Sequence, residues 1–204
     1  MSARLRMVRA FAPGSVGNVG PGLDILGLAL TGPGDRVRAE LAATPGIVLR
    51  DPGGRELPTD AGRNTAGLAA REVLRRAGVE RETGLVLSVE KGLPLAAGQG
   101  GSAASAVAAA VAVNHLLGNP LSRQGLLEAC LTAEEAVAGR HADNVAPSLL
   151  GGIVLIRSLD PIDAVSIPVP ENLVVVLALP DQQLKTRDGR SVLPEQVSRS
   201  LALH

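Results

Sequence analysis

The chain has 204 residues, 46% of them hydrophobic, and its 20 basic residues balance 20 acidic ones. This length and hydrophobic content predict a globular protein whose core comes from one domain, or from one domain and part of a second. No stretch concentrates Lys or Arg, so the sequence predicts no nucleic-acid partner. With one Phe and no Trp or Tyr, ligand contacts must come mainly from backbone, hydroxyl, amide and charged groups.

The single cysteine, Cys130, excludes an internal disulfide and indicates a reducing compartment. We expect its thiol to pack as a small hydrophobe. The first residues lack the apolar stretch of a secretory signal, and no segment has the roughly 18 apolar residues that a membrane span requires. The sequence therefore predicts a cytoplasmic protein with no membrane contact.

The N-terminal part is predicted to form strands separated by glycine-rich turns. Residues 4–11 alternate polar and apolar side chains, as a strand does, and a glycine-rich loop follows over 12–24. Residues 25–30 and 36–43 are predicted as two further strands. A first helix is predicted over 64–77.

That helix has clear ends. Asn64 is a suitable N-cap, Arg75 and Arg76 are charges of the last turn, and Gly78 follows. Residues 84–92 then form a predicted strand that ends at a glycine loop.

The stretch from Ser102 to about Leu117 carries no charge, which predicts a helix buried on nearly every side and ended by Gly118 and Pro120. His115 within it is expected to be structural or solvated. Beyond it the sequence predicts a helix over 121–138, strands over 151–158 and 172–180, and a helix starting near 189–201. Together these elements predict an α+β fold.

The glycine loop ahead of the uncharged helix is a candidate phosphate site. A helix N-terminus exposes unpaired N–H groups and a partial positive charge, and glycines let the backbone wrap an anion. The loop is not a Walker A sequence and does not match G-x-G-x-x-G. The alternative is a turn whose small residues allow close packing of the helix on the sheet.

Four segments in order resemble the GHMP small-molecule kinases, in the form of the homoserine kinase subfamily. "PLAAGQGGSAASAVAA" resembles the nucleotide motif Pro-x-x-x-Gly-Leu-Gly-Ser-Ser-Ala, and "APGSVGNVGPGLDILGLAL" resembles the N-terminal motif. "RHADNVAPSLLGG" and "LKTRDGRSVLP" are similar to two segments of that subfamily. The usual Leu and first Ser of the nucleotide motif are Gln99 and Gly101 here.

The resemblance implies ATP-dependent phosphorylation of L-homoserine to O-phospho-L-homoserine in threonine biosynthesis, with Mg²⁺. It also implies an N-terminal α+β domain similar to domain 2 of ribosomal protein S5, with a left-handed β-α-β crossover, over 1–168. We expect residues 169–204 to begin an incomplete C-terminal α+β domain, because a helix is predicted just before the chain stops. An exposed apolar face there would favour association, and we leave open a homodimer.

The resemblance also assigns site residues by position. The expected ATP-binding set is Pro94, Gly98, Gln99, Gly100, Gly101, Ser102, Ala103 and Ser105. Ser102 and Glu134 are the expected Mg²⁺ ligands, with Glu135 as the alternative to Glu134. The expected homoserine-binding set is Asn18, Asp24, His141, Asp143, Asn144, Thr186 and Arg190.

Asp143, Asn144 and Arg190 are the expected catalytic residues. Arg190 would hold the substrate carboxylate, since a guanidinium suits a carboxylate. Asp143 would either accept the proton of the substrate hydroxyl or only orient the substrate, and the sequence is compatible with both roles. Taken singly, Asp24 and the "HADN" residues also suit an ordinary turn or helix-to-loop junction.

Two alternative functions remain. One is a different GHMP-type kinase, acting on mevalonate or a sugar-like alcohol. The other is a chain with little or no catalysis, since nothing in it corresponds to the family's third, C-terminal glycine motif. If these 204 residues are the whole protein, we predict little turnover.

Overall fold

The computed structural model describes residues 5–179, 194 and 196. It consists of a sheet with helices packed on one face. The elements in chain order are β1 (Met7–Val16), β2 (Leu26–Ala42), β3 (Gly46–Asp51), α1 (Thr65–Arg76), β4 (Gly84–Glu90), α2 (Gly101–Leu116), α3 (Arg123–Glu135), α4 (Val145–Leu150), β5 (Ile153–Leu159) and β6 (Ile162–Ile167). The strands pair mostly antiparallel, and runs of strands and helices follow one another instead of alternating strictly, so the α+β expectation is confirmed.

The strand β2 organises the sheet. The order is β3-β4-β2-β5-β6, and β1 also pairs with β2. β2 is antiparallel to β1, β4 and β5. The two halves of β2 pair with different strands: Val37 lies opposite Val89 of β4, and Gly27 lies opposite Val154 of β5. β3 and β4 are parallel and are joined through α1. This β3-α1-β4 unit is where the expected crossover would lie.

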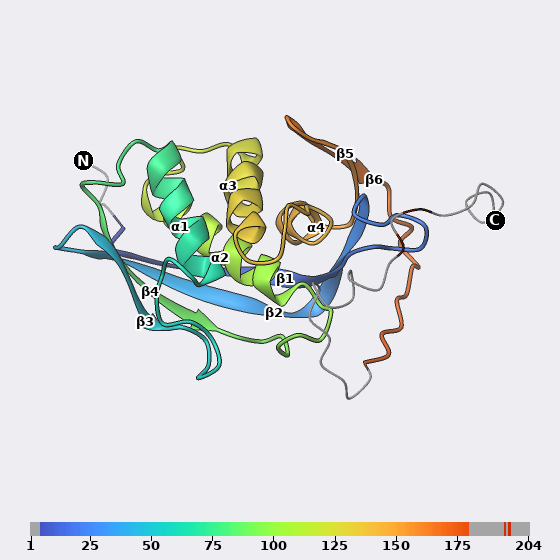
Figure 1. Ribbon diagram of the computed structural model, residues 1–204, viewed down its shortest axis with the longest axis horizontal. Helices are drawn as coiled ribbons and strands as arrows, with labels where there is room; N and C mark the ends of the chain where they lie inside the picture. Colours follow the sequence, from blue (N-terminus) through green and yellow to red (C-terminus); the bar gives the residue numbers. More distant parts are fainter. Residues whose placement is uncertain (1–4, 180–193, 195, 197–204) are drawn as a thin grey trace.

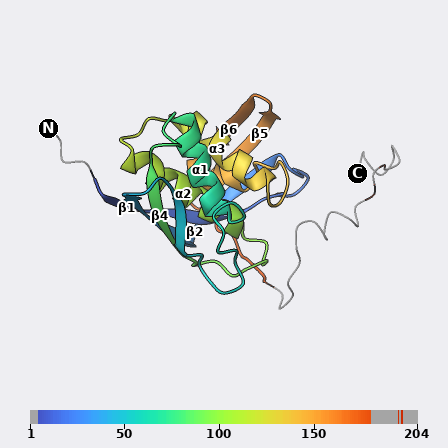
Figure 2. The same ribbon diagram turned by 60° about the vertical axis from the view of Figure 1, so that its left-hand side comes forward.

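The helices form the second layer, on the same side of β1, β2 and β4 (Figures 1 and 2). α2 lies directly on β1 and β2 and also packs against α1, α3 and α4. Its run of Ala and Val makes this possible, because small side chains let a helix approach its neighbours on nearly every side. The predicted burial of this helix is confirmed. Cys130 of α3 is fully buried in the same core.

The predicted ends of α1 are confirmed by its cap. The Asn64 side chain accepts a hydrogen bond from the Ala66 N–H, which satisfies one of the free amides of the first turn. At the other end Arg75 and Arg76 both bind Glu72, and Arg76 also binds Glu128 of α3. Arg76 therefore joins α1 to α3, whereas Arg75 is paired within α1.

Several predicted boundaries are wrong. The two strands predicted over 25–30 and 36–43 merge into the single strand β2, Leu26–Ala42, because the Gly-Pro-Gly segment between them still pairs with β1, with Pro13 opposite Gly34. Residues 12–16, predicted as loop, extend β1. The strands β3 and β6 and the short helix α4 were not predicted, since each has only six residues and too little pattern to read.

The predicted strand over 172–180 is also wrong for its described part. Residues 173–179 form no ladder, and Val174 and Val176 are 81% and 89% exposed. An apolar β-branched run favours a strand only when a partner supplies the pairing hydrogen bonds. The helix predicted near 189–201 lies outside the described residues, apart from 194 and 196, where no helix is present. No helix among the described residues is long and apolar enough to cross a membrane.

Candidate active site

The N-terminus of α2 is bare backbone. Its N-cap, Gly100, has a left-handed conformation with φ 64°, and no side chain caps the helix. A Cβ on Gly100 would lie 2.2 Å from Ser15 Oγ and 2.8 Å from Asn144 Oδ1, so the position has no room for one. No side chain therefore caps the N–H groups of this first turn, and an uncapped helix N-terminus attracts anions.

The loop is fastened to the sheet through β1. The Ser15 N–H donates to the Gln99 carbonyl at 3.1 Å. Gly14 makes this approach possible, because a Cβ there would lie 2.9 Å from Leu93 and 3.2 Å from the Gln99 oxygen. The Gln99 residue is itself buried, whereas Pro94 at the start of the loop is exposed. The loop is therefore held by the Gln99 backbone, and Gly100 lies close against Ser15 and Asn144.

A buried ion pair lies beneath the loop and was missed in the sequence. Lys91, the residue after β4, binds Asp35 of β2, which is fully buried. The Lys91 ammonium also donates to the Gly101 carbonyl at 2.8 Å and to Ser105 Oγ at 3.1 Å. Ser105 in turn donates to Asp35 at 2.6 Å, so its hydroxyl faces the interior. The available signal was a lysine ending an apolar strand immediately before a glycine loop.

Ser102 and Glu134, the two expected metal ligands, are in contact. The Ser102 hydroxyl donates to Glu134 Oε1 at 2.7 Å across the α2–α3 interface. Glu134 Oε2 is buried and has no hydrogen-bond partner. Burial raises the pKa of Glu134, and the nearby charge of Asp143 adds to the rise. A buried, half-satisfied carboxylate of this kind would gain from a cation.

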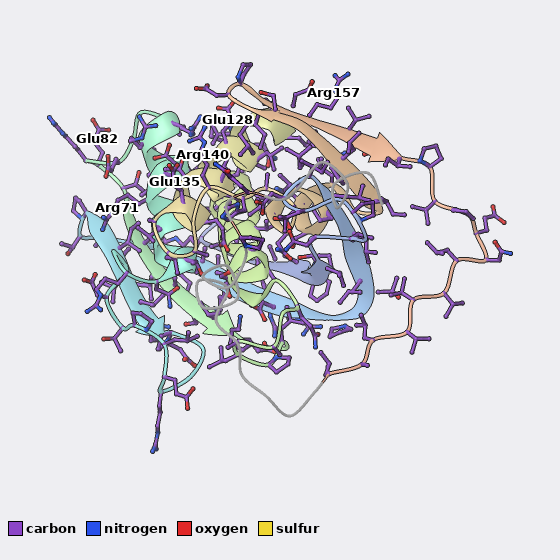
Figure 3. All side chains as sticks on the ribbon, turned by 45° about the vertical axis from the view of Figure 1, so that its right-hand side comes forward. Arg71, Glu82, Glu128, Glu135, Arg140 and Arg157 are labelled. Carbon is purple, nitrogen blue, oxygen red and sulfur yellow. The ribbon has the colours of Figure 1, made fainter. Side chains whose placement is uncertain are left out.

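The alternative ligand, Glu135, points elsewhere. Its carboxylate pairs with Arg140 at 3.0 Å, and both side chains are more than 40% exposed. Figure 3 labels both residues, near Glu128 of α3. Of the two candidates, the structure brings only Glu134 to the start of α2.

Asp143 and Asn144 lie at the N-terminus of α4, beside the end of β1. Asp143 Oδ2 accepts from the Asn18 N–H at 3.0 Å, and Asn144 Oδ1 accepts from Ser15 Oγ at 3.0 Å. Gly17 permits both contacts, because a Cβ there would lie 2.1 Å from the Asp143 carboxylate. The segment after β1 and the segment before α4, far apart in sequence, thus form one wall of the site.

The pKa of Asp143 is raised. Burial is the largest cause, the Asn18 N–H opposes it, and the carboxylate of Asp24 adds to the rise. A carboxyl group with a raised pKa is a better proton acceptor than an ordinary one, provided that it is still ionised at the working pH.

Asp24 and His141 form the outer part of the same wall. The His141 Nδ1 lies 3.2 Å from Asp24 Oδ1, and the Asp24 N–H donates to Asn18 Oδ1 at 2.8 Å. Asn18 and Asp24 both have positive φ, which these two residue types tolerate better than most. The turn between them therefore holds both side chains in defined positions.

The structure thus links Glu134 and Asn144 to the start of α2, and Asn18, Asp24, His141 and Asp143 form the adjoining wall. The Ser105 hydroxyl is directed to Asp35 instead. Ala103 is buried within the first turn of that helix. Thr186 and Arg190 lie outside the described residues. Among the described residues, no group of three or more His, Cys, Asp or Glu side chains is placed to hold a metal ion. A cation here would need ligands from elsewhere, such as phosphate oxygens or water.

Residues 64–152 match the family described as the GHMP kinases N terminal domain. The chain is 40% identical over 206 residues to a homoserine kinase of Chlorobium phaeobacteroides, and the match covers 95% of this chain and 64% of that protein. A crystal structure of homoserine kinase from Cytophaga hutchinsonii superimposes with a TM-score of 0.89 at 38% identity, over 100% of this chain and 65% of that one.

A crystal structure of mevalonate kinase from Methanococcus jannaschii is similar in fold alone. Its TM-score is 0.61 at 14% identity, and the match covers 82% of this chain and 57% of that one. The chain spans 64% of the length of the Chlorobium relative and 65% of the Cytophaga chain.

Proposed function

We propose that this chain, which belongs to the GHMP kinase family, forms the nucleotide-binding part of an enzyme that phosphorylates L-homoserine with ATP. The product would be O-phospho-L-homoserine, on the route to threonine. One observation carries the proposal. The side-chain-free N-terminus of α2 opens beside two buried carboxyl groups, Glu134 and Asp143.

The first turn of α2 would hold the ATP phosphates. Gly98, Gly100 and Gly101 leave the N–H groups uncovered, and the helix dipole adds a positive field. Ser102 stands at the same turn and could add a hydroxyl. Phosphoryl transfer depends mainly on positioning and charge neutralisation, and a helix N-terminus supplies both.

Ser102 and Glu134 fit a magnesium ion. The unpartnered Glu134 Oε2 is the kind of hard oxygen ligand that Mg²⁺ prefers, and Ser102 Oγ is already in contact with the other oxygen. A bound Mg²⁺ would neutralise charge on the phosphate oxygens. Because the protein offers few ligands here, water and phosphate would complete the shell.

The acceptor would lie against the wall formed by the segments around Asp24 and Asp143. Homoserine carries an ammonium, which suits carboxylates, and Asp24 is held by His141 and by Asn18. By resemblance, Thr186 and Arg190 complete this subsite, with Arg190 on the substrate carboxylate. Neither has a described position.

Asp143 is the candidate to receive the hydroxyl proton. In the transfer, the homoserine oxygen bonds to the γ-phosphorus while the bond to the β–γ bridging oxygen breaks. The hydroxyl proton passes either to the Asp143 carboxylate or to a phosphoryl oxygen. The raised pKa of Asp143 favours transfer of the proton to its carboxylate. The hydrogen bond from the Asn18 N–H holds this carboxylate in place for both routes.

A coupled assay of ADP release tests the substrate. We expect release with L-homoserine, and none above background with mevalonate or galactose. Activity on either of the latter alone would replace homoserine by another GHMP-type substrate. Nucleotide binding without turnover on any of the three would favour the non-catalytic alternative. Calorimetry with Mg-ATP and L-homoserine, separately and together, resolves binding from chemistry.

We further propose a cytoplasmic location, since the substrates are free small molecules and the single Cys130 indicates a reducing compartment. The division of the chain after residue 168 remains a proposal as well. The last described strand, β6, ends one residue earlier, at Ile167.

A further inference from the structure

We propose that Lys91 is a positioning residue, which together with Asp35 fixes the first turn of α2, and that a side chain at position 101 would crowd its ammonium. This inference deepens the proposed nucleotide site and rests on it. It concerns the buried ion pair between Lys91 and Asp35, which has no role in the reaction proposed above.

The Lys91 ammonium is fully engaged inside the protein. An ammonium has three N–H donors, and Lys91 has three acceptors, namely the Asp35 carboxylate, the Gly101 carbonyl and Ser105 Oγ. Its side chain is only 11% exposed. No donor is left for a ligand phosphate in this arrangement, so Lys91 acts through the helix and not on the nucleotide.

Asp35 joins three elements through its two oxygens. It lies in β2 and is fully buried, and it accepts from Lys91, from Ser105 Oγ at 2.6 Å and from the Gly92 N–H at 3.1 Å. β2, the end of β4 and the first two turns of α2 therefore meet at one carboxylate. A buried charge pair with all its hydrogen bonds satisfied fixes geometry closely, because any displacement leaves a buried charge unpaired.

Gly101 is matched to this pair. A Cβ on Gly101 would lie 3.3 Å from Lys91 Nζ, and its next neighbours would be 3.8 Å or more away. The ammonium is held by three partners and cannot withdraw freely. A side chain at this position would therefore press on the ammonium, which would have to shift by a few tenths of an ångström.

The test compares Asp35→Asn with the wild-type chain by calorimetry with Mg-ADP. We expect Asp35→Asn to weaken ADP binding by about tenfold or more, as loss of a charged hydrogen-bond partner does. If Lys91 instead served as a phosphate ligand, freeing its ammonium would tighten ADP binding. Tighter binding overturns the proposal, and so does unchanged binding.

Glu90→Gln is the matched control. Glu90 is the residue before Lys91, and its ion pair with Arg9 is more than half exposed. Removing an exposed pair changes little, so this variant should bind ADP as the wild-type chain does. Should Asp35→Asn fail to fold, the double variant Lys91→Met with Asp35→Asn removes both buried charges, and the same weakening is expected.

Amide hydrogen exchange in the nucleotide-free chain provides a second readout. The amides of residues 104–107 bond to the carbonyls of the first turn of α2, as Ala104 does to Gly100. Asp35→Asn should speed their exchange while α1 is unaffected, and equal exchange in both helices would overturn the inference. If the wild-type chain binds no ADP, the proposed function fails, and this exchange result still decides the role of Lys91.

A double-mutant cycle tests the match with Gly101. Alanine favours a helix over glycine, so Gly101→Ala alone should stabilise the chain unless it crowds Lys91. We expect Gly101→Ala to lower the thermal midpoint of the wild-type chain. In the chain that already carries Lys91→Met and Asp35→Asn, we expect Gly101→Ala to raise the thermal midpoint. The same sign in both backgrounds would mean that Lys91 and Gly101 are independent.

Discussion

The Ser102 hydroxyl donates to one oxygen of Glu134 at 2.7 Å and leaves the other oxygen of that buried carboxylate without a partner. This contact joins the start of α2 to the end of α3. It places a half-satisfied acid beside the helix terminus that is expected to receive phosphates.

Glu134→Gln tests this acid. We expect the variant to lose the Mg²⁺ dependence of nucleotide binding, because an amide is a far weaker cation ligand than a carboxylate. Its thermal midpoint at neutral pH should not fall, since the change removes a buried charge that has only one hydrogen bond. Magnesium titrations followed by calorimetry give the first result, and thermal unfolding gives the second. Glu135→Gln, on the outer side of α3, is the control and should behave as the wild type.

The pKa shifts of Glu134 and Asp143 predict how stability depends on pH. Both are raised in the folded chain, so the native state holds their protons more tightly than the unfolded state does. Their contribution to stability is therefore full below the unfolded pKa values of 4.5 and 3.8 and is lost as the pH rises through the folded values. Unfolding midpoints across this range should fall less steeply in Glu134→Gln and Asp143→Asn than in the wild type. An equal slope would show that these groups are not shifted.

Asp143→Asn separates chemistry from binding. The amide keeps an oxygen for the Asn18 N–H but cannot accept a proton from the substrate. If Asp143 is a general base, turnover should fall by about 10² to 10⁴ with ADP affinity unchanged, which is the usual range for such a group. A loss of less than tenfold would assign it to substrate orientation. Steady-state rates and calorimetry on the same preparation provide the two measurements.

Gly100→Ala tests the bare N-cap. The position has φ 64°, and an added Cβ would lie 2.2 Å from Ser15 Oγ, so both strain and a clash are expected. Gly118, just after α2, has φ 88° with no atom within 4 Å, and it serves as the control. Gly118→Ala should lose about 1 to 2 kcal/mol of stability from backbone strain alone and keep ADP binding. Gly100→Ala should lose more stability and also weaken ADP binding.

Arg190→Ala tests the substrate carboxylate clamp that the resemblance implies. We expect a strong rise in the KM for homoserine with ATP affinity nearly unchanged, because the change removes a bidentate partner of one substrate only. Equal losses for both substrates would show that the residue serves another role.

The sequence by itself determined the local features with strong patterns. The uncharged run of α2 required burial, the N-cap Asn64 marked the start of α1, and the glycines at 98–101 marked an open helix terminus. Each of these follows from residues that are neighbours in the chain, so composition and spacing are sufficient to read them.

Only the tertiary structure decided which distant residues meet. Asp35 and Lys91 are 56 residues apart, and nothing in the local pattern of β2 distinguishes Asp35 as the partner of a lysine beneath the glycine loop. The choice of Glu134 over Glu135 is similar, because the two are adjacent in sequence and differ only in which face of α3 they occupy. Burial and pairing are properties of packed surfaces, so they become visible only once the helices lie on the sheet.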